Sequence, residues 1–164
     1  MNESDYILKP HRLADLIAAI QVMGTYSYSA RAVDSWSKLL GDKPRSAETW
    51  VEVFNQHPEF FRAGIQDNGQ HTLALRRAQP RVFNTKTSKE ITTDEFEQLS
   101  DEEKKKYSRK PLSAPQITFL VEVAIRLQSQ AIAQRQERRW WMPHVMSVIT
   151  LIIGLVTGAL LKYL

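Results

Sequence analysis

The sequence predicts an α+β chain with three parts: a small domain of three helices and a β-hairpin, a long amphipathic helix, and a single C-terminal transmembrane helix. Apolar residues recur at steps of three and four through residues 11–57, which is the helical period. A turn signal and an alternating stretch follow in residues 67–77, as in a hairpin. The run from Val145 to Leu161 has no ionisable side chain, which is typical of a membrane span.

Composition limits the classes of protein to consider. A length of 164 residues allows one compact domain with appendages. The absence of cysteine excludes disulfides, thiolate metal sites and cysteine nucleophiles. The net charge of +4 suits anionic lipid or nucleic acid and indicates neither of them. The N-terminal stretch MNESDYILKPHR has no apolar h-region, so we expect no signal peptide.

Three helices are predicted within a domain of residues 10–80, after a polar leader of residues 1–9. The first helix spans residues 11–25, and the second spans residues 30–40 and ends at Gly41. Ser46 is the expected N-cap of the third helix. The apolar residues that share a face within these helices are Leu13, Leu16, Ile17, Ile20, Met23, Val33, Trp36, Leu39, Leu40, Trp50, Val53 and Phe54.

A hairpin is predicted after these helices. Asp67, Asn68 and Gly69 tolerate a positive φ at its tip, and Leu73 and Leu75 then alternate with polar or small residues on the other face. The stretch HPEFFRAGIQDNGQHTLALRR, at residues 57–77, resembles the end of the third helix and the wing of the winged-helix superfamily, in which three helices precede a two-stranded wing. The alternative is an unrelated small α+β domain.

Residues 81–112 are predicted to form a charged, turn-rich connector with a small hairpin and short helices. Acidic residues precede the basic run of residues 104–110, and we interpret this charge as a solvated, self-compensating face, favoured over a phosphate or lipid contact. Residues 113–140 are predicted to form a long amphipathic juxtamembrane helix. Its apolar stripe covers about two heptads, and it either packs on the domain or self-associates as a coiled coil.

Residues 141–164 are predicted to form a tail anchor that spans the membrane once. Aromatic and basic residues at its ends are expected at the two membrane interfaces. Because arginines precede the run and only Lys162 follows it, the positive-inside rule places the N-terminal domain in the cytoplasm. The expected interface residues are Arg135, Arg138, Arg139, Trp140, Trp141 and Tyr163, with anionic lipid as the partner of the arginines.

The predicted anchor also carries a small-residue face. Thr150, Gly154 and Gly158 lie four residues apart, a spacing that lets two membrane helices approach closely. We therefore expect these residues to pair two copies of the chain as a homodimer.

Nucleic-acid recognition is the usual use of a winged helix, whose third helix enters the major groove in the DNA-binding members. Glu48 and Glu52 on that helix would face phosphates, so the sequence favours protein binding over nucleic-acid binding. The residues that the nucleic-acid alternative would use are Arg45, Asn55, Gln56, Arg76, Arg77 and Arg81.

No catalytic or metal-binding pattern is found in the sequence. The four histidines, His11, His57, His71 and His144, share no ligand spacing, and neither an HExxH motif nor a Gly-rich phosphate loop is present. We therefore expect no enzymatic activity, no metal and no cofactor.

These observations predict a membrane-anchored adaptor or scaffold. Its cytoplasmic winged-helix-like module would mediate protein–protein interaction with an unknown partner at the lipid bilayer. The alternative is a membrane-tethered regulator whose winged helix binds DNA or RNA. A third hypothesis is a regulatory subunit of a membrane complex whose chemistry lies in another chain.

Overall fold

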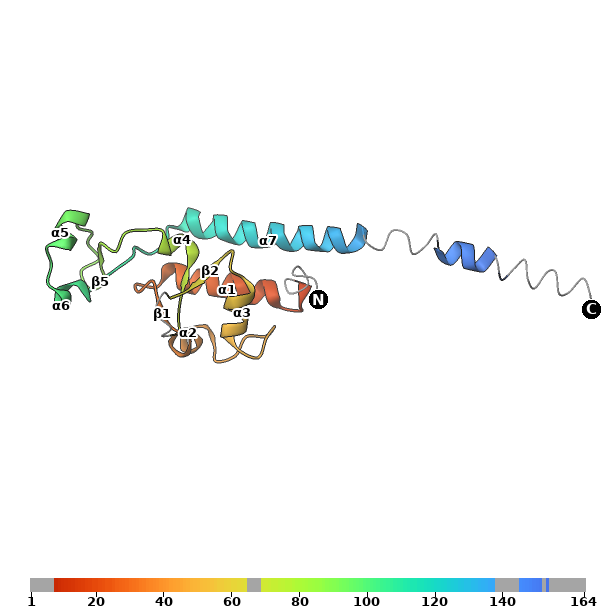
Figure 1. The fold of residues 1–164 in the computed structure, drawn as a ribbon, viewed down its shortest axis with the longest axis horizontal. Helices are drawn as coiled ribbons and strands as arrows, with labels where there is room; N and C mark the ends of the chain where they lie inside the picture. The colour runs from red at the N-terminus through yellow and green to blue at the C-terminus, as the bar shows by residue number, and fades with distance from the viewer. Residues whose placement is uncertain (1–7, 65–68, 138–144, 152, 154–164) are drawn as a thin grey trace, which may run out of the picture. The chain divides into compact units, whose positions relative to one another are not determined.

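The computed structural model describes residues 8–64, 69–137, 145–151 and 153 (Figure 1). The chain divides into two compact units, one up to Gln128 and one from Ser129 onward. The division falls within the long helix α7 (Ala114–Glu137).

The first unit begins with helices that follow the apolar spacing. Helix α1 (Arg12–Thr25) and helix α2 (Val33–Leu40) lie within the predicted ranges. Helix α3 (Trp50–Gln56) starts later than predicted, because Thr49 and not Ser46 is its N-cap: the Thr49 hydroxyl accepts a hydrogen bond from the Glu52 amide at 3.3 Å. The Ser46 side chain instead donates to Asp15 on α1.

A three-stranded antiparallel sheet accompanies these helices. Strand β2 (Phe61–Ala63) and strand β3 (Gln70–Leu73) form the predicted hairpin, with Phe61 opposite Leu73. Strand β1 (Arg31–Ala32) pairs with the other edge of β3, so the order is β1-β3-β2. A two-residue strand carries no alternation, and the sequence therefore did not indicate β1.

Helix α4 (Ala74–Arg77) replaces the predicted continuation of the second hairpin strand. In a continued strand, Arg76 would share a face with Thr72 and Ala74, as the alternation predicted. The helical turn instead directs Arg76 into the protein, where its side chain is fully buried. The prediction of a strand over residues 74–77 is therefore wrong.

The core of the first unit joins all these elements. Trp36 on α2 is fully buried, and its indole Nε1 donates to the His71 carbonyl of β3 at 2.9 Å, so the largest core side chain has no unpaired polar atom. The other buried apolar residues of this core are Leu16, Ala19, Ile20, Met23, Trp50, Val53, Phe54, Phe60, Phe61, Leu73, Leu112, Leu120 and Ala124.

The first half of α7 packs on the domain, as one of the two interpretations of its apolar stripe predicted. Leu120 and Ala124 are buried in the same core as α1 and α3, and the part of α7 within the first unit lies beside α1 (Figure 1). A Cβ built on Gly24 of α1 would lie 3.2 Å from Ile117 Cγ1 of α7. The two helices thus approach closely at a residue without a side chain.

An arm of the chain, residues 79–111, carries the remaining small elements. Strands β4 (Phe83–Asn84) and β5 (Tyr107–Ser108) pair with each other. Between them lie helices α5 (Thr93–Glu97) and α6 (Asp101–Lys104), which start with capping boxes at Thr92 and Ser100. Figure 1 shows α5 and α6 at the far end of the arm, away from α1.

The prediction of a C-terminal transmembrane helix is contradicted. Within the described parts of the chain, no helix is both long enough and apolar enough to cross a bilayer. Helix α7 has 24 residues, but it carries Glu122, Arg126, Arg135 and Glu137. The described helix at residues 145–151 and 153 is shorter than the ~20 residues that a span requires. The predicted location, that of a tail-anchored, single-pass membrane protein with a cytoplasmic domain, depended on this helix and is contradicted as well.

Several residues singled out in the C-terminal part lie outside the described residues. These are Arg138, Arg139, Trp140, Trp141 and Tyr163 of the expected interfaces and Gly154 and Gly158 of the expected pairing face. Arg135 is exposed on α7, and the Thr150 hydroxyl donates to the Met146 carbonyl at 2.9 Å. The tip of the β2–β3 hairpin, residues 65–68, is also outside the described residues.

Arg76 connects the arm and the start of α7 to the domain. Its guanidinium donates to six backbone carbonyls and is paired with no carboxylate in the described ranges. Burial, and then the charge of Arg109, lower the pKa of Arg76 to about 10, so the group remains protonated at neutral pH. The accepting carbonyls belong to Met23, Tyr26, Ser27, Tyr28, Arg109 and Lys110, at distances of 2.6–3.4 Å.

Replacing Arg76 with methionine is expected to destabilise the protein strongly. Several buried carbonyls would lose their donor, at about 1 to 3 kcal/mol each, so we expect the free energy of unfolding to fall by about 3 kcal/mol or more. Arg77→Met is the matched control, because the neighbouring side chain is only half-buried and donates to a single carbonyl, that of Ala63. Urea denaturation measures both variants. An equal loss of unfolding free energy in the two variants would contradict this role of Arg76.

Candidate interaction surfaces

A groove of about 320 Å³ lies between α2 and the start of α3. Trp50, which is buried, and Val33 and Val51 give it an apolar lining. Val51 is 39% exposed and Leu39, on α2, is 41% exposed, so apolar surface reaches solvent on both helices. The groove therefore has the mixture of buried aromatic and exposed aliphatic surface that a protein side chain can fill.

Carboxylates line this groove in excess over cations. Asp34, Asp42 and Glu48 lie in its wall, against Lys38. Glu48 is held by Lys43 at 2.6 Å, and this pair is well exposed and hence weak. Asp34 and Asp42 have no ion pair among the described residues. The groove is consequently acidic, a property that the sequence did not indicate because its carboxylates are separated along the chain.

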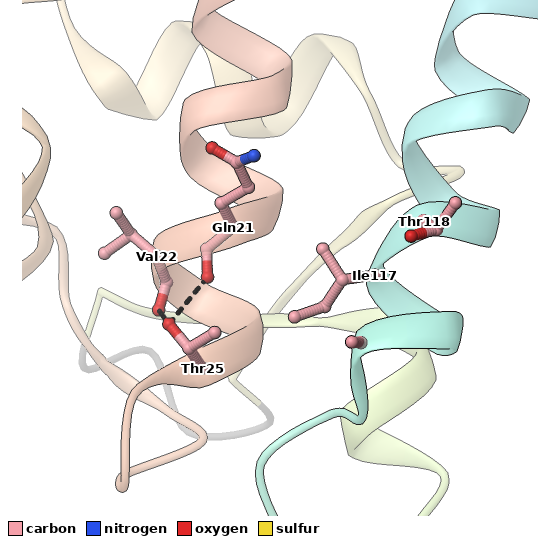
Figure 2. Close-up of a pocket in the computed structure, with 6 residues that line it drawn as sticks. Gln21, Val22, Thr25, Ile117 and Thr118 are labelled. Carbon is pink, nitrogen blue, oxygen red and sulfur yellow. Dashed lines mark hydrogen bonds between the residues drawn. The ribbon is translucent and has the colours of Figure 1, made fainter.

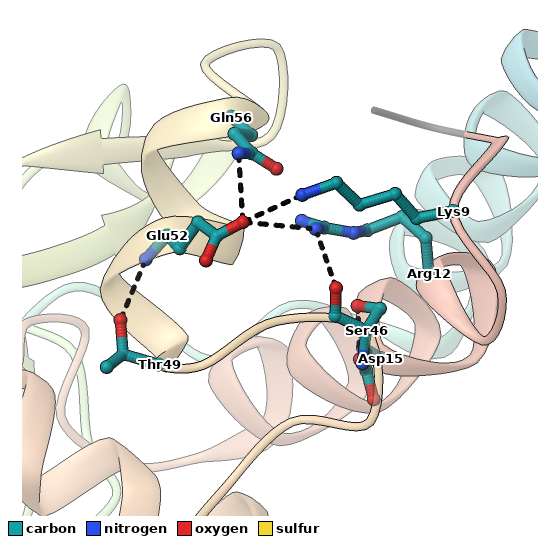
Figure 3. Close-up of polar contacts among 7 residues, drawn as sticks. All are labelled: Lys9, Arg12, Asp15, Ser46, Thr49, Glu52 and Gln56. Carbon is teal, nitrogen blue, oxygen red and sulfur yellow. Dashed lines mark hydrogen bonds and ion pairs between the residues drawn. The ribbon is translucent and has the colours of Figure 1, made fainter. Parts of the chain in front are cut away.

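A polar network fixes α3 to the start of α1 (Figure 3). Glu52 on α3 accepts from Lys9 at 2.8 Å, and its carboxylate lies 3.9 Å from the buried guanidinium of Arg12. Arg12 in turn donates to the Ser46 carbonyl at 3.2 Å. Asp15 completes the network by accepting from the amide and hydroxyl of Ser46.

The charge of Glu52 is therefore compensated within the protein. The hydrogen bond from Lys9 is the main reason that the pKa of Glu52 lies below its ordinary value of 4.5. Because the folded-state pKa of Glu52 is lowered, its ionised carboxylate stabilises the folded protein above about pH 4.5. This stabilisation is lost as the pH falls through the folded-state pKa. Glu52 thus acts as a structural partner of α1.

Both amide residues proposed to read bases make contacts with other side chains of the protein. The Gln56 Nε2 donates to the Glu52 carboxylate at 3.1 Å (Figure 3). The side-chain oxygen of Asn55 lies 3.4 Å from Nε2 of His71 on β3. A base contact by either residue would have to replace these interactions.

The arginines of the nucleic-acid alternative do not form one surface. Arg76 is fully buried, so its guanidinium is not available to a phosphate. Arg45 is exposed on the loop before α3, and its amide donates to Asp15. Arg77 and Arg81 lie near Arg109 at the base of the arm, where each guanidinium donates to backbone carbonyls. Sequence spacing had indicated Arg77 and Arg81 but not Arg109.

A second groove, of about 400 Å³, lies between α1 and α7 (Figure 2). Val22 on α1 and Ile117 on α7 face it, together with Ala114. Thr25 donates its hydroxyl to the Gln21 carbonyl at 2.8 Å, so this polar group is satisfied within α1. The lining contains no charged residue; its polar members are Gln21, Thr25 and Thr118.

Groups for catalysis or metal binding are not assembled in the described ranges. No set of three or more His, Cys, Asp or Glu side chains there is placed to hold a metal ion. His57 is buried with Nδ1 2.7 Å from Glu59, and His71 lies against the ring of Phe54 at 5.2 Å between centroids. Both histidines are thus placed as parts of the domain's interior.

Comparison of the chain with protein-family models, with curated proteins and with solved structures found no match.

His71 gives the domain a testable pH dependence. Burial lowers the pKa of His71 below its ordinary value of 6.5. Acidification then protonates the unfolded chain before the folded one, so the free energy of unfolding should fall as the pH drops below about 6.5. Urea denaturation at pH 7.5, 6.5 and 5.5 measures this fall. His71→Phe should make the profile flatter, whereas the control His11→Gln should keep it; a His71→Phe profile as steep as the parent's would contradict the assignment.

Proposed function

We propose that this chain is an adaptor that binds a partner protein, with the groove between α2 and α3 as the docking surface. The single observation that carries the proposal is the combination of an apolar floor, centred on Trp50, with a carboxylate-rich wall at Asp34 and Asp42. A pocket with an aromatic floor and a polar rim is typical of the centre of a protein interface.

The order of elements supports a winged-helix assignment for residues 8–77. Helices α1, α2 and α3 precede the β2–β3 hairpin, and β1 extends the hairpin to the sheet order β1-β3-β2. Many winged helices serve as protein-binding modules. We propose that this domain does so as well, with the paired helices α2 and α3 as its contact elements.

The charge of the α2–α3 surface disfavours nucleic acid as the partner. A phosphate backbone gains most of its affinity from Lys and Arg side chains. The wall of the groove offers three carboxylates and one lysine, and Glu52 on α3 is paired with Lys9. A phosphate placed against α3 would therefore meet carboxylates at close range.

The same charge defines the chemistry of the proposed partner. An exposed segment with an aliphatic side chain would cover Val51, and an adjacent Lys or Arg would face Asp34 and Asp42. An acidic segment would be rejected, because its carboxylates would repel those of the groove. Charge complementarity of this kind contributes to specificity more than to affinity. A basic, partly apolar segment is thus the partner that fits.

Selection from a random peptide library on the full-length chain tests this proposal. We expect the selected peptides to pair a Lys or Arg with a neighbouring aliphatic residue. The dissociation constant of such a peptide should rise about tenfold or more in Val51→Lys. The new lysine repels the Lys or Arg of the peptide, and the change removes apolar surface from the groove. Glu122→Lys, on the exposed face of α7, is the matched control and should bind as the parent does.

Two results would contradict the adaptor proposal. One is a set of selected peptides whose affinity does not change in Val51→Lys. The other is binding of duplex DNA by the parent chain with a steep inverse dependence on salt, which would favour the nucleic-acid alternative.

A further inference from the structure

Three arginines meet where the arm leaves the domain. Nε of Arg109 lies 3.1 Å from both the Arg77 carbonyl and the Gln79 carbonyl. In the opposite direction, Arg81 donates to the Tyr107 carbonyl at 2.8 Å and to the Lys104 carbonyl at 3.3 Å. The segments around residues 77–81 and 104–109 thereby bind each other through their guanidinium groups.

No carboxylate compensates this cluster in the described part of the chain. Two lysines nearby in sequence are paired with carboxylates: Lys105 with Glu102 at 2.6 Å, and Lys110 with Glu90. Arg77, Arg81 and Arg109 have only backbone carbonyls as partners there. The basic run of residues 104–110 is thus only partly self-compensating.

Arg109 feels the charge of the other two arginines. Burial first, and then the charges of Arg81 and Arg77, lower the pKa of Arg109, which indicates that the guanidinium groups feel each other's charge. Backbone carbonyls offset a positive charge only in part, since each contributes a dipole and no net charge. An anion in contact with all three would relieve the repulsion.

Donor groups remain for such an anion. A guanidinium has five N–H donors. Among the described residues, Arg109 uses only Nε, Arg77 uses only Nη1, and Arg81 uses Nε and Nη2. Arg81 is exposed and the other two are half-buried, so solvent reaches the cluster. Planar forks of this kind match the oxygens of phosphate groups, which they bind in bidentate fashion.

We propose that Arg77, Arg81 and Arg109 form a binding site for a compact, multiply charged oxyanion of the phosphate class. The site is separate from the acidic α2–α3 groove, and it does not depend on the function proposed for that groove. The anion could be free in solution or carried by a phosphorylated side chain of another protein.

Titration of inorganic pyrophosphate into the full-length chain tests the site, with ionic strength held constant by sodium chloride. Arginine Nε–Hε signals in nitrogen–proton NMR spectra report each guanidinium separately. We expect saturable shifts of the Arg81 and Arg109 signals, and a dissociation constant at least tenfold weaker in Arg81→Gln. Arg126→Gln, on the exposed face of α7, is the matched control and should leave the titration unchanged.

Several outcomes decide the proposal. Arg77→Gln should weaken binding as Arg81→Gln does, and retained dispersion of the amide spectrum shows that each variant is folded. A phosphoserine peptide that displaces pyrophosphate places the anion on a partner, whereas its failure to compete places it in solution. Shifts that equal those with chloride alone, or that survive both substitutions, overturn the site. An oligonucleotide that binds while pyrophosphate does not would overturn it as well.

Discussion

The guanidinium of Arg76 is the constraint on which the first unit depends. It brings the carbonyls at the end of α1, in the following loop and before α7 to one point, and no other side chain has the five N–H donors with which arginine serves these six carbonyls. The Leu112 amide then donates to the Gly24 carbonyl at 2.8 Å, which places the start of α7 against α1. The packing of Leu120 and Ala124 on the core follows from that placement.

A second polar network determines which surface is left for a partner. Lys9 and Arg12 hold Glu52, and Asp15 holds the loop before α3. These contacts hold α3 and the loop before it against the start of α1, and they engage polar groups that a nucleic acid would need. The α2–α3 groove stays open beside them with an acidic wall, while positive charge gathers at the base of the arm. The acidic groove and the three arginines thus lie on different parts of the first unit.

The sequence predicted the parts of the fold whose apolar residues repeat at a regular spacing. Helices α1 and α2 and the hairpin were found because their core residues repeat at fixed steps, as Leu16, Ile20 and Met23 do. Features set by tertiary contacts were not found. Strand β1 exists only as a partner of β3, α3 is capped by Thr49 because Ser46 is taken by Asp15, and nothing local distinguishes buried Arg76 from Arg77. The acidic groove and the arginine cluster likewise join residues that are distant in the chain.

Amide hydrogen exchange of Leu112 tests the central claim most directly, namely that Arg76 makes the start of α7 part of one cooperative unit with the domain. In the parent chain, the Leu112 amide should exchange with the same opening free energy and denaturant dependence as the Leu73 amide in the core. In Arg76→Met, the Leu112 amide should exchange through a local opening, with a lower opening free energy and a weaker denaturant dependence than the Leu73 amide. A Leu112 amide that already exchanges by a small, low-energy opening in the parent chain would contradict the claim.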